Sequence, residues 1–444
     1  MPKDTRIFHR APSASLPVAV RGEGAYLYDA DGRQYLDASG GAAISIIGHG
    51  HPAVIAAIRE QAGALAFAHT SFFTSAPSEA LAVSLIEGAP PGLSHVYFLS
   101  GGSEATEAAL KLARQYHVAA GEPERTVFIH RRQSYHGNTI GALSVSGNPK
   151  RRAPYEPILP PAVSIAPCYA YRHQRAGESV DAYAERSAAE LEAEIVRAGP
   201  GRVAAFIAEP VVGATLGAVA AVPGYFERIQ ATCRRHGVLL IADEVMCGMG
   251  RTGTRYASTG FGIEPDLVTV AKGLAGGYQP LGALIVHRRV YEQVTAERGA
   301  FVHGHTYSGH PTACAAGLAV QRVLQEERLV ERVPALGAQV VAALTDAIGA
   351  HPHVGDIRGR GLLLGIELVE SRDTRRPFPA ARGVAQAIKK AGMEEGLICY
   401  PGSGTADGVD GDHILLAPPY TWTDREVGEL ADKLGRTLRR VLGG

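Results

Sequence analysis

The sequence lacks the features of several large classes of protein. Its 444 residues carry 44 Lys and Arg against 44 Asp and Glu, so there is no basic excess of the kind that nucleic-acid binding needs. The longest uncharged stretch, 38–58, is interrupted by glycine, histidine and proline and makes a poor membrane span. Residues 1–6 are polar and show no apolar core of a signal peptide. We therefore expect no nucleic-acid partner, no membrane partner and a cytoplasmic location.

Cysteine is scarce and scattered, and clusters of metal ligands are almost missing. The five cysteines stand singly, with no spacing typical of disulfides or metal sites: Cys168, Cys233, Cys247, Cys314 and Cys399. We interpret them as reduced thiols packed as small apolar groups. Three nearby histidines, His303, His305 and His310, have no ordered carboxylate or cysteine beside them. We predict no metal site.

Short apolar runs alternate with helical stretches along most of the chain. The runs are nearly continuous in apolar residues, which favours strands covered on both faces rather than strands with one solvent-exposed face. They lie at 95–99, 126–129, 203–207, 238–242, 266–270 and 283–286. Helical segments such as 104–120 and 183–198 separate them. The pattern predicts an α/β fold, a mostly parallel sheet with helices on both faces.

The two ends of the chain differ from its middle. Residues 26–37 predict a hairpin, and strand candidates at 362–368 and 413–416 stand between helices near the C-terminus. We predict a smaller α+β lobe formed by both termini, because 444 residues exceed one compact core. The predicted division is 1–60 and 331–444 for the small lobe and 61–330 for the large domain.

A glycine-rich turn, Ser100-Gly101-Gly102-Ser103-Glu104, follows one strand and opens a helix. Glycines let the backbone approach a ligand, and a helix N-terminus offers free N–H groups and the positive end of a dipole. With the hydroxyl of Ser103, the turn predicts a phosphate site. An ordinary turn with Ser103 as N-cap is the alternative. The sequence has no Walker A or dinucleotide-binding fingerprint at this turn, which disfavours a nucleotide-dependent oxidoreductase.

Two charged residues stand at the ends of apolar strands. Asp243 follows the run 238–242, where burial of its carboxylate needs a cation or hydrogen-bond donors. A protonated pyridine nitrogen is such a cation, and pairing with Arg251 is the alternative. Lys272 follows the run 266–270, where burial would lower its pKa and make the amine nucleophilic. A lysine that reaches water from the strand end is the alternative.

Two further motifs follow other strands. Tyr135 and His136 come after the run 126–129, and an aromatic ring there can stack on a flat ligand. Glu209 ends the run 203–207 just before a proline. Each motif alone could be a surface turn. Together, a phosphate site, an aromatic platform, a carboxylate and a buried lysine are what pyridoxal phosphate needs.

At these residues the sequence resembles the class III aminotransferases, which have the type I pyridoxal-phosphate fold. The resemblance covers most of the chain, and its segments occur in the family's order. They are Ser-Gly-Gly-Ser-Glu-Ala at 100–105, Tyr-His-Gly at 135–137, Glu-Pro at 209–210, Asp-Glu-Val at 243–245, Gly-Arg-Thr-Gly at 250–253, Ala-Lys-Gly at 271–273 and His-Thr-Tyr-Ser-Gly-His-Pro at 305–311.

The resemblance implies roles for individual residues. Lys272 would form the Schiff base with pyridoxal phosphate and shuttle the proton, Asp243 would keep the pyridine nitrogen protonated, and Tyr135 would stack on the ring. Other residues would bind the phosphate, cover the second ring face or line the pocket: Gly101, Gly102, Ser103, His136, Glu209, Val245 and Thr306. Thr306 would reach the phosphate of the neighbouring subunit, which implies a homodimer with shared active sites.

The sequence departs from the family pattern where a substrate carboxylate is usually bound. Related enzymes carry an arginine shortly before the Ala-Pro-Pro segment or slightly upstream, and here 404–412 and 413–419 contain none. Because such a clamp is hard to replace, we predict transfer from an amine or ω-amino acid to a small 2-oxo acid such as pyruvate. A dialkylglycine-type decarboxylase, an aminomutase or a racemase remains the alternative. Phe72 and Phe73 are expected in the pocket or the core.

Overall fold

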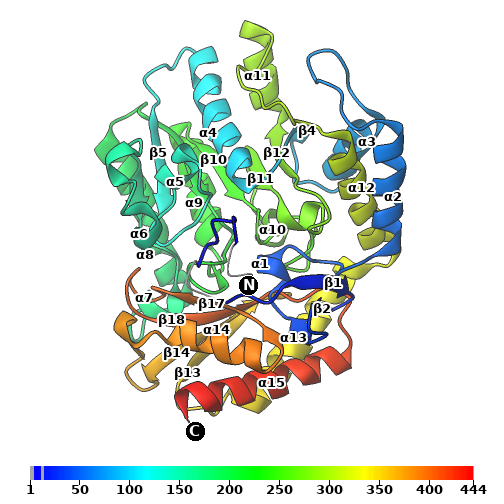
Figure 1. The fold of residues 1–444 in the computed structure, drawn as a ribbon. Helices are drawn as coiled ribbons and strands as arrows, with labels where there is room; N and C mark the ends of the chain where they lie inside the picture. Colours follow the sequence, from blue (N-terminus) through cyan, green and yellow to red (C-terminus); the bar gives the residue numbers. More distant parts are fainter. Residues whose placement is uncertain (1–4, 12–14, 444) are drawn as a thin grey trace.

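A seven-stranded sheet lies at the centre of the computed structural model, which describes residues 5–11 and 15–443 (Figure 1). Its strand order is β4-β12-β11-β10-β7-β5-β6. In that order the strands are Leu93–Leu99, Gly282–His287, Leu267–Val270, Leu239–Asp243, Val203–Ala208, Val127–Arg131 and Val163–Ile165. Within the sheet, only β12 runs antiparallel to its neighbours. The predicted mostly parallel sheet is confirmed.

The central strands are apolar throughout because helices cover both faces of the sheet. All six residues of β7 are buried. Ala205 and Ile207 join the core under α4 (Gly102–Ala119), whereas Phe206, on the opposite face, joins the core under α8 (Val180–Ala198) and α9 (Tyr225–His236). This alternation follows from the two-residue period of a strand.

The remaining sheets bring the two ends of the chain together. One has the order β1-β2-β3-β16 and another β13-β14-β18-β17, with β15 beside β14. Their strands are Ala19–Glu23, Tyr26–Asp29, Gln34–Asp37 and Leu397–Ile398, then Val354–Arg360, Leu363–Ser371, Asp412–Leu416, Tyr400–Ser403 and Arg376–Pro377. Tyr26 also donates a hydrogen bond to Glu429 at 2.8 Å. A smaller α+β part therefore contains both N- and C-terminal segments, while the boundaries at 60/61 and 330/331 stay a prediction.

Three long helices pack around these smaller sheets: α13 (Leu329–Ile348), α14 (Val384–Glu394) and α15 (Asp424–Leu442). The other helices are α1 (Gly40–Ala43), α2 (Pro52–Ala64), α3 (Ala76–Ile86), α5 (Ile140–Ser144), α6 (Pro149–Arg152), α7 (Ala170–His173), α10 (Ala257–Gly260), α11 (Arg288–Arg298) and α12 (Pro311–Glu326). Short 3-10 turns η1 (Glu156–Ile158), η2 (Lys272–Leu274) and η3 (Ala380–Arg382) and a hairpin of β8 (Val211–Val212) and β9 (Val219–Ala220) complete the fold.

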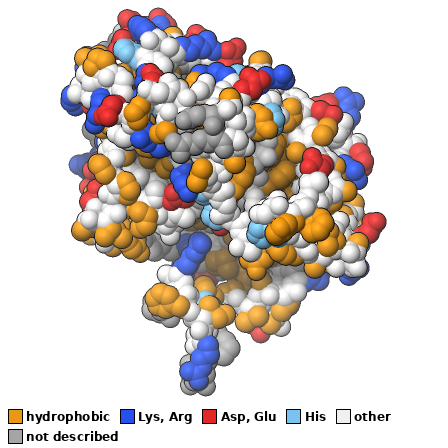
Figure 2. All heavy atoms as spheres, turned by 90° about the horizontal axis from the view of Figure 1, so that it is seen from above, with side chains coloured by type: hydrophobic (Ala, Val, Ile, Leu, Met, Phe, Trp, Pro, Cys, Tyr) orange, Lys and Arg blue, Asp and Glu red, His pale blue; other side chains and the backbone are white. Residues whose placement is uncertain are grey.

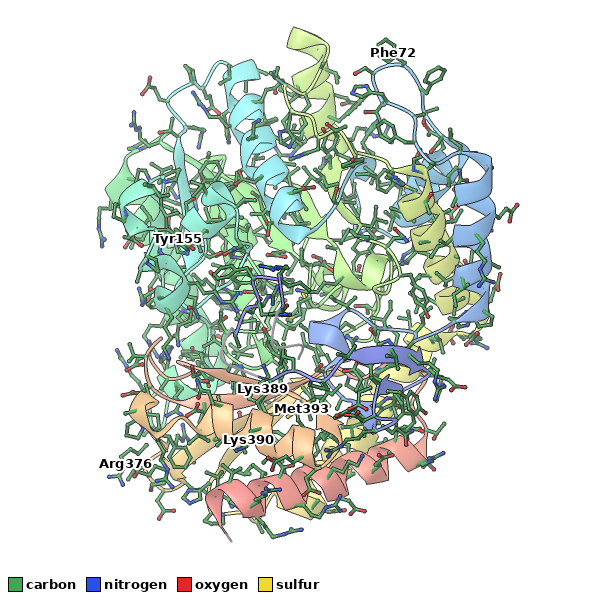
Figure 3. All side chains as sticks on the ribbon, viewed as in Figure 1. Phe72, Tyr155, Arg376, Lys389, Lys390 and Met393 are labelled. Atoms are coloured by element: carbon green, nitrogen blue, oxygen red, sulfur yellow. The ribbon has the colours of Figure 1, made fainter. Side chains whose placement is uncertain are left out.

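Within one chain, Phe72 and Phe73 lie neither in the core nor in the cavity that holds Lys272. Their side chains are 80% and 67% exposed, on the loop between α2 and α3. In Figure 3 this loop stands at the edge of the molecule and Phe72 points outward. The sequence alone does not distinguish an exposed phenylalanine from a buried one, because apolar side chains also make up part of a protein's surface.

The described residues contain neither a membrane-spanning helix nor a cluster of metal ligands. Within the ranges 5–11 and 15–443, every helix is too short or too polar to span a lipid bilayer. In the same part of the chain, no three His, Cys, Asp or Glu side chains are grouped as metal ligands would be. Residues 1–4, which belong to the segment assessed as a leader, lie outside the described residues.

Candidate active site

Most of the predicted site residues line one cavity of about 770 Å³. The parallel strands β5, β7, β10 and β11 end at the same edge of the sheet, and the residues that follow them meet there. The predicted residues in the cavity wall are Gly102, Ser103, Tyr135, His136, Glu209, Asp243, Val245 and Lys272. Residues from at least four separate segments of the chain thus converge as the sequence predicted.

Asp243 is the last residue of β10 and is 3% exposed. Its Oδ2 lies 2.6 Å from Nδ1 of His136. Its Oδ1 accepts hydrogen bonds from Thr269 Oγ1 at 3.1 Å and from Val245 N at 3.0 Å. Arg251, the alternative partner, instead donates to the carbonyls of Leu362 and Pro418. The buried carboxylate is therefore held by neutral donors and a histidine, and no arginine pairs with it among the side chains that the structure describes.

Lys272 directly follows β11 and begins the turn η2. Its φ of +48° is unusual for a residue with a side chain and reflects a sharp turn out of the strand. Burial lowers the pKa of Lys272, and the positive charge of Arg151 lowers it further, against the opposing effects of Asp243 and Glu209. A lowered pKa raises the fraction of neutral amine, which is the nucleophilic form.

The first turn of α4 forms one wall of the cavity. Gly101 is the N-cap in an extended conformation, so Ser103 is not the N-cap as the alternative supposed. A Cβ on Gly102 would lie 2.8 Å from a methyl of Val245, and one on Gly137 would lie 2.8 Å from Ser103 Cα. Only glycines allow this close packing beside the helix N-terminus, where the dipole favours an anion.

Tyr135 and Glu209 both line the cavity and are joined by a hydrogen bond. Glu209 accepts hydrogen bonds from Tyr135 N at 3.1 Å and from Gly213 N at 3.0 Å, and it is 4% exposed. Burial raises its pKa, and the nearby charge of Asp243 adds to this effect. The alternative of an exposed turn carboxylate is therefore wrong, because the backbone donors bring Glu209 inside.

Several residues of the site were missed by sequence reasoning. His136 N donates to Ser146 Oγ at 2.8 Å, and Thr106 Oγ1 donates to His136 O at 2.7 Å. These bonds hold the backbone of His136, and the imidazole, which contacts Asp243 through Nδ1, has a buried Nε2 with no partner among the described residues. Lys150 and Arg151 also line the cavity. Their adjacent positive charges after Tyr135 are a signal that could have drawn notice.

Gly101 and Thr306 are the two predicted site residues that do not line this cavity. Gly101 directly precedes Gly102 as the N-cap of α4. The side chain of Thr306 is exposed and lines a separate cavity of about 580 Å³ with His303 and His305. Within one chain, therefore, Thr306 is not in the cavity that contains Lys272. The third histidine, His310, is outside the lining of both cavities.

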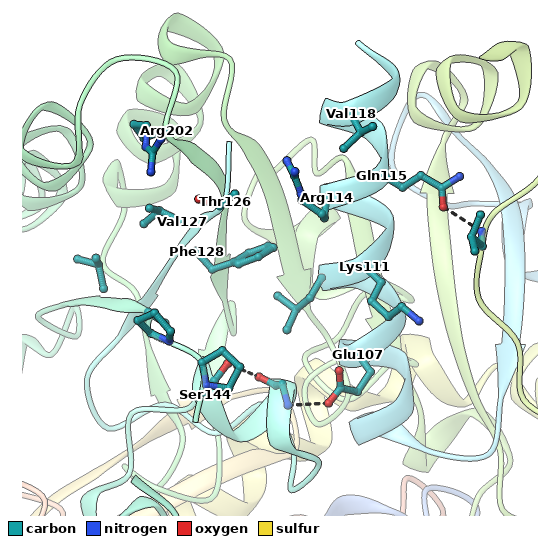
Figure 4. Close-up of a pocket in the computed structure, with 17 residues that line it drawn as sticks. Glu107, Lys111, Arg114, Gln115, Val118, Thr126, Val127, Phe128, Ser144 and Arg202 are labelled. Atoms are coloured by element: carbon teal, nitrogen blue, oxygen red, sulfur yellow. Dashed lines mark hydrogen bonds between the residues drawn. The ribbon is translucent and has the colours of Figure 1, made fainter. Parts of the chain in front are cut away.

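A larger cavity, about 880 Å³, lies between α4 and the β5–β6 edge of the sheet (Figure 4). Glu107, Lys111, Arg114 and Arg202 stand around apolar side chains such as Phe128. None of the predicted site residues lines it. Volume alone does not indicate the active site, whereas a buried lysine and carboxylate in one cavity do.

Comparison with known proteins decides the family. Residues 8–438 match the family model described as aminotransferase class-III. The chain is 44% identical over 440 residues to an uncharacterized aminotransferase of Schizosaccharomyces pombe. The aligned residues make up 98% of this chain and 95% of that protein. The chain belongs to the class III aminotransferases.

Two further relatives indicate the chemistry and the fold of this aminotransferase. It is 38% identical over 430 residues to a diaminobutyrate–2-oxoglutarate transaminase of Halomonas elongata, with 96% of this chain and 90% of that protein covered. An omega transaminase from Pseudomonas jessenii, in complex with PMP, has a TM-score of 0.92 and 34% identity over 99% of this chain and 98% of that one. The enzyme is a pyridoxal-phosphate-dependent transaminase of the type I fold, which confirms the prediction.

The cavity fits pyridoxal phosphate by its donor groups and by its shape. The amine of Lys272 suits the aldehyde, and the carboxylate of Asp243 suits a protonated pyridine nitrogen. The glycine-lined N-terminus of α4 suits the phosphate. The unpartnered Nε2 of His136 offers one more polar contact at the buried side.

Proposed function

We propose that this aminotransferase moves an amino group from an amine or ω-amino acid to a small 2-oxo acid such as pyruvate, with Lys272 as the residue that binds the cofactor. The observation that carries the proposal is the convergence of Lys272 and Asp243, from neighbouring parallel strands, on the cavity beside the N-terminus of α4. A buried amine and a buried carboxylate in one cleft are typical of a catalytic pair.

When bound, pyridoxal phosphate would supply an electron sink for the reaction at the substrate carbon. Lys272 would hold the cofactor, and its Nζ would take and return the proton of the transfer. Asp243, held by His136 and Thr269, would keep the pyridine nitrogen protonated. Tyr135 would stack on the ring.

The remaining residues of the set bind and position the cofactor. Val245 would cover the ring face opposite Tyr135, and a Cβ on Gly102 would lie 2.8 Å from its methyl, so Val245 packs closely beside α4. Gly101, Gly102 and Ser103 would bind the phosphate through the first turn of the helix. Glu209 supports the backbone of Tyr135 from behind.

The proposal of a small 2-oxo acid as amino acceptor rests on the absence of an arginine from residues 404–419. The three aspartates of this segment do not form a cation site, since backbone N–H groups occupy all of them: Asp407 accepts from Val409 and Asp410, Asp410 accepts from Ala380, and Asp412 accepts from Ala385. Nothing in this segment replaces the bidentate clamp that a long dicarboxylate needs. The Halomonas relative is named for 2-oxoglutarate, so the acceptor of this enzyme has to be measured.

We also infer a homodimer with shared active sites. Thr306 is exposed and outside the Lys272 cavity, which suits a residue that acts on the neighbouring subunit. Large apolar side chains near it are exposed, including Val302 at 68% and Tyr307 at 62%. Figure 2 looks down on the end of the molecule with the Phe72 loop, where hydrophobic side chains form patches among charged ones. Such patches favour coverage by a partner. A cytoplasmic location stays a prediction.

Half-reactions followed by visible absorption test this function. The holoenzyme is mixed with an amine or ω-amino acid, and then with pyruvate or 2-oxoglutarate, while alanine and glutamate are measured. We expect a cofactor band that shifts with the donor and alanine formation from pyruvate. A clear preference for 2-oxoglutarate would contradict the acceptor. Products without net amino transfer would favour the decarboxylase, aminomutase or racemase alternative.

A further inference from the structure

Three consecutive cationic residues on one side of the cavity have different surroundings. Arg152 is fully used, since it donates to the carbonyls of Leu143, Ser144 and Ser146 and pairs with Glu156. Lys150 donates to Ser403 Oγ and Val409 O, both at 3.1 Å. Arg151 differs from both.

The guanidinium of Arg151 lines the cavity without a hydrogen-bond acceptor or carboxylate partner among the residues that the structure describes. Its Cζ lies 4.2 Å from the centre of the Tyr135 ring. Stacking on an aromatic ring fixes the plane of a guanidinium and leaves its edge of N–H donors free. The charge is close enough to Lys272 to lower the pKa of that amine.

Among the described residues, the acidic side chains of the cavity are not free to pair with Arg151. The two acidic residues that line it are already engaged, Asp243 by His136 and Glu209 by two backbone N–H groups. Arg10, Lys150 and Arg151 add positive charge beyond Lys272. A half-buried guanidinium in such a cavity is suited to bind an anion that arrives with the substrate.

We propose that Arg151 binds the carboxylate of the substrate, in place of the arginine that this chain lacks before Ala417-Pro418-Pro419. The substrates that gain from this contact are amino acids and 2-oxo acids with a carboxylate within reach of Arg151, whereas a simple amine reacts without it. Lys150 adds a second positive charge beside it. This inference rests on the proposed function, because the carboxylate has to enter the cavity of Lys272.

The alternative anion, the cofactor phosphate, has its own place at the N-terminus of α4. A Cβ on Gly102 there would lie 2.8 Å from a methyl of Val245, whereas Arg151 is on α6 and stacks on Tyr135. Loss of the Arg151 guanidinium should therefore leave cofactor affinity nearly unchanged. Binding of a carboxylate should instead weaken strongly, because a bidentate charged pair would be lost.

The test compares Arg151→Gln and Arg151→Lys with the matched control Arg132→Gln, whose exposed arginine lies outside the cavity. Each holoenzyme is titrated with propanoate, an unreactive carboxylate, by calorimetry, and cofactor content is measured by absorbance. Half-reactions use pyruvate and 1-phenylethylamine, which lacks a carboxylate. For Arg151→Gln we expect propanoate Kd and pyruvate KM to rise about 10- to 100-fold. The amine reaction, kcat and cofactor affinity should change less than about threefold.

Arg151→Lys keeps the charge but loses the planar guanidinium that can bind a carboxylate through two N–H groups. Its propanoate affinity should therefore fall between those of the wild type and Arg151→Gln. Equal propanoate binding by wild type and Arg151→Gln, or no binding by either, would overturn the inference. The inference would also be overturned if Arg151→Gln lost activity equally with pyruvate and with the amine, or if it no longer bound the cofactor. Failure of the proposed function is recognised separately, as a wild type whose absorbance does not respond to any amine.

Discussion

Nδ1 of His136 lies 2.6 Å from Oδ2 of Asp243, although the two residues are 107 positions apart. The pair links the loop after β5 to the end of β10, and both side chains are at most 3% exposed. An imidazole N–H donated to the carboxylate fixes the tautomer and places Nε2 towards the remaining buried space. The orientation of the carboxylate therefore depends on a residue that does not itself carry out the chemistry.

His136→Leu should destabilise the apoenzyme and weaken cofactor binding. The change leaves Oδ2 of Asp243 buried without this donor, which costs about 1–3 kcal/mol of unfolding free energy. Denaturant unfolding and a cofactor titration measure the two effects. His136→Gln, whose amide can donate to the carboxylate, should recover part of both. Unchanged stability and affinity in His136→Leu would show that the contact contributes nothing.

Lys272→Ala should abolish turnover while the protein stays folded. Loss of the amine removes both the attachment of the cofactor and the proton transfer, and we expect kcat to fall by about 10³-fold or more. Lys389→Ala is the control, since Lys389 is exposed on α14 (Figure 3). Circular dichroism checks the fold and visible absorption follows the response to amines. Full activity of Lys272→Ala would contradict the assigned role.

Much of the fold and site could be predicted because the signals are local. Continuous apolar runs identify strands buried on both faces, and the polar residues after them meet at one sheet edge. The hydrogen bonds of Asp243 with Thr269 and of His136 with Ser146 could not be predicted, since they depend on the register of elements far apart in sequence. Strand β13 was missed because Asp, Arg and Gly interrupt its apolar pattern.

The pH dependence of stability should include a contribution from His413. This side chain is fully buried in β18, and burial, aided by the charge of Arg358, lowers its pKa from 6.5 to about 4. Between these values the unfolded chain binds a proton that the folded chain does not. The stabilisation that comes from keeping His413 neutral is therefore complete above pH 6.5 and is lost as the pH falls towards 4. The free energy of unfolding decreases by about 3 kcal/mol over this range.

His413→Gln removes this titration and tests its sign. The variant loses hydrogen bonding with Thr405 at every pH, so only the change with pH is compared. Unfolding free energies of wild type and variant are measured at pH 7 and pH 4, and the wild type should lose about 3 kcal/mol more. A wild type that loses no more than the variant would show that His413 is not held neutral by burial.

Mixed dimers should reveal whether Thr306 acts on the neighbouring subunit. If Thr306 lies beside the cofactor phosphate of the neighbouring subunit, Thr306→Glu adds a negative charge there and should leave little activity, as should Lys272→Ala. If sites are shared, a heterodimer of the two variants has one site with both changes and one with neither. Random mixing, in which half of the dimers are heterodimers, then restores about a quarter of wild-type activity. If each chain builds its own site, every site carries one change and mixing restores nothing. Dimers carrying two different tags, purified in sequence, allow this activity to be measured per heterodimer.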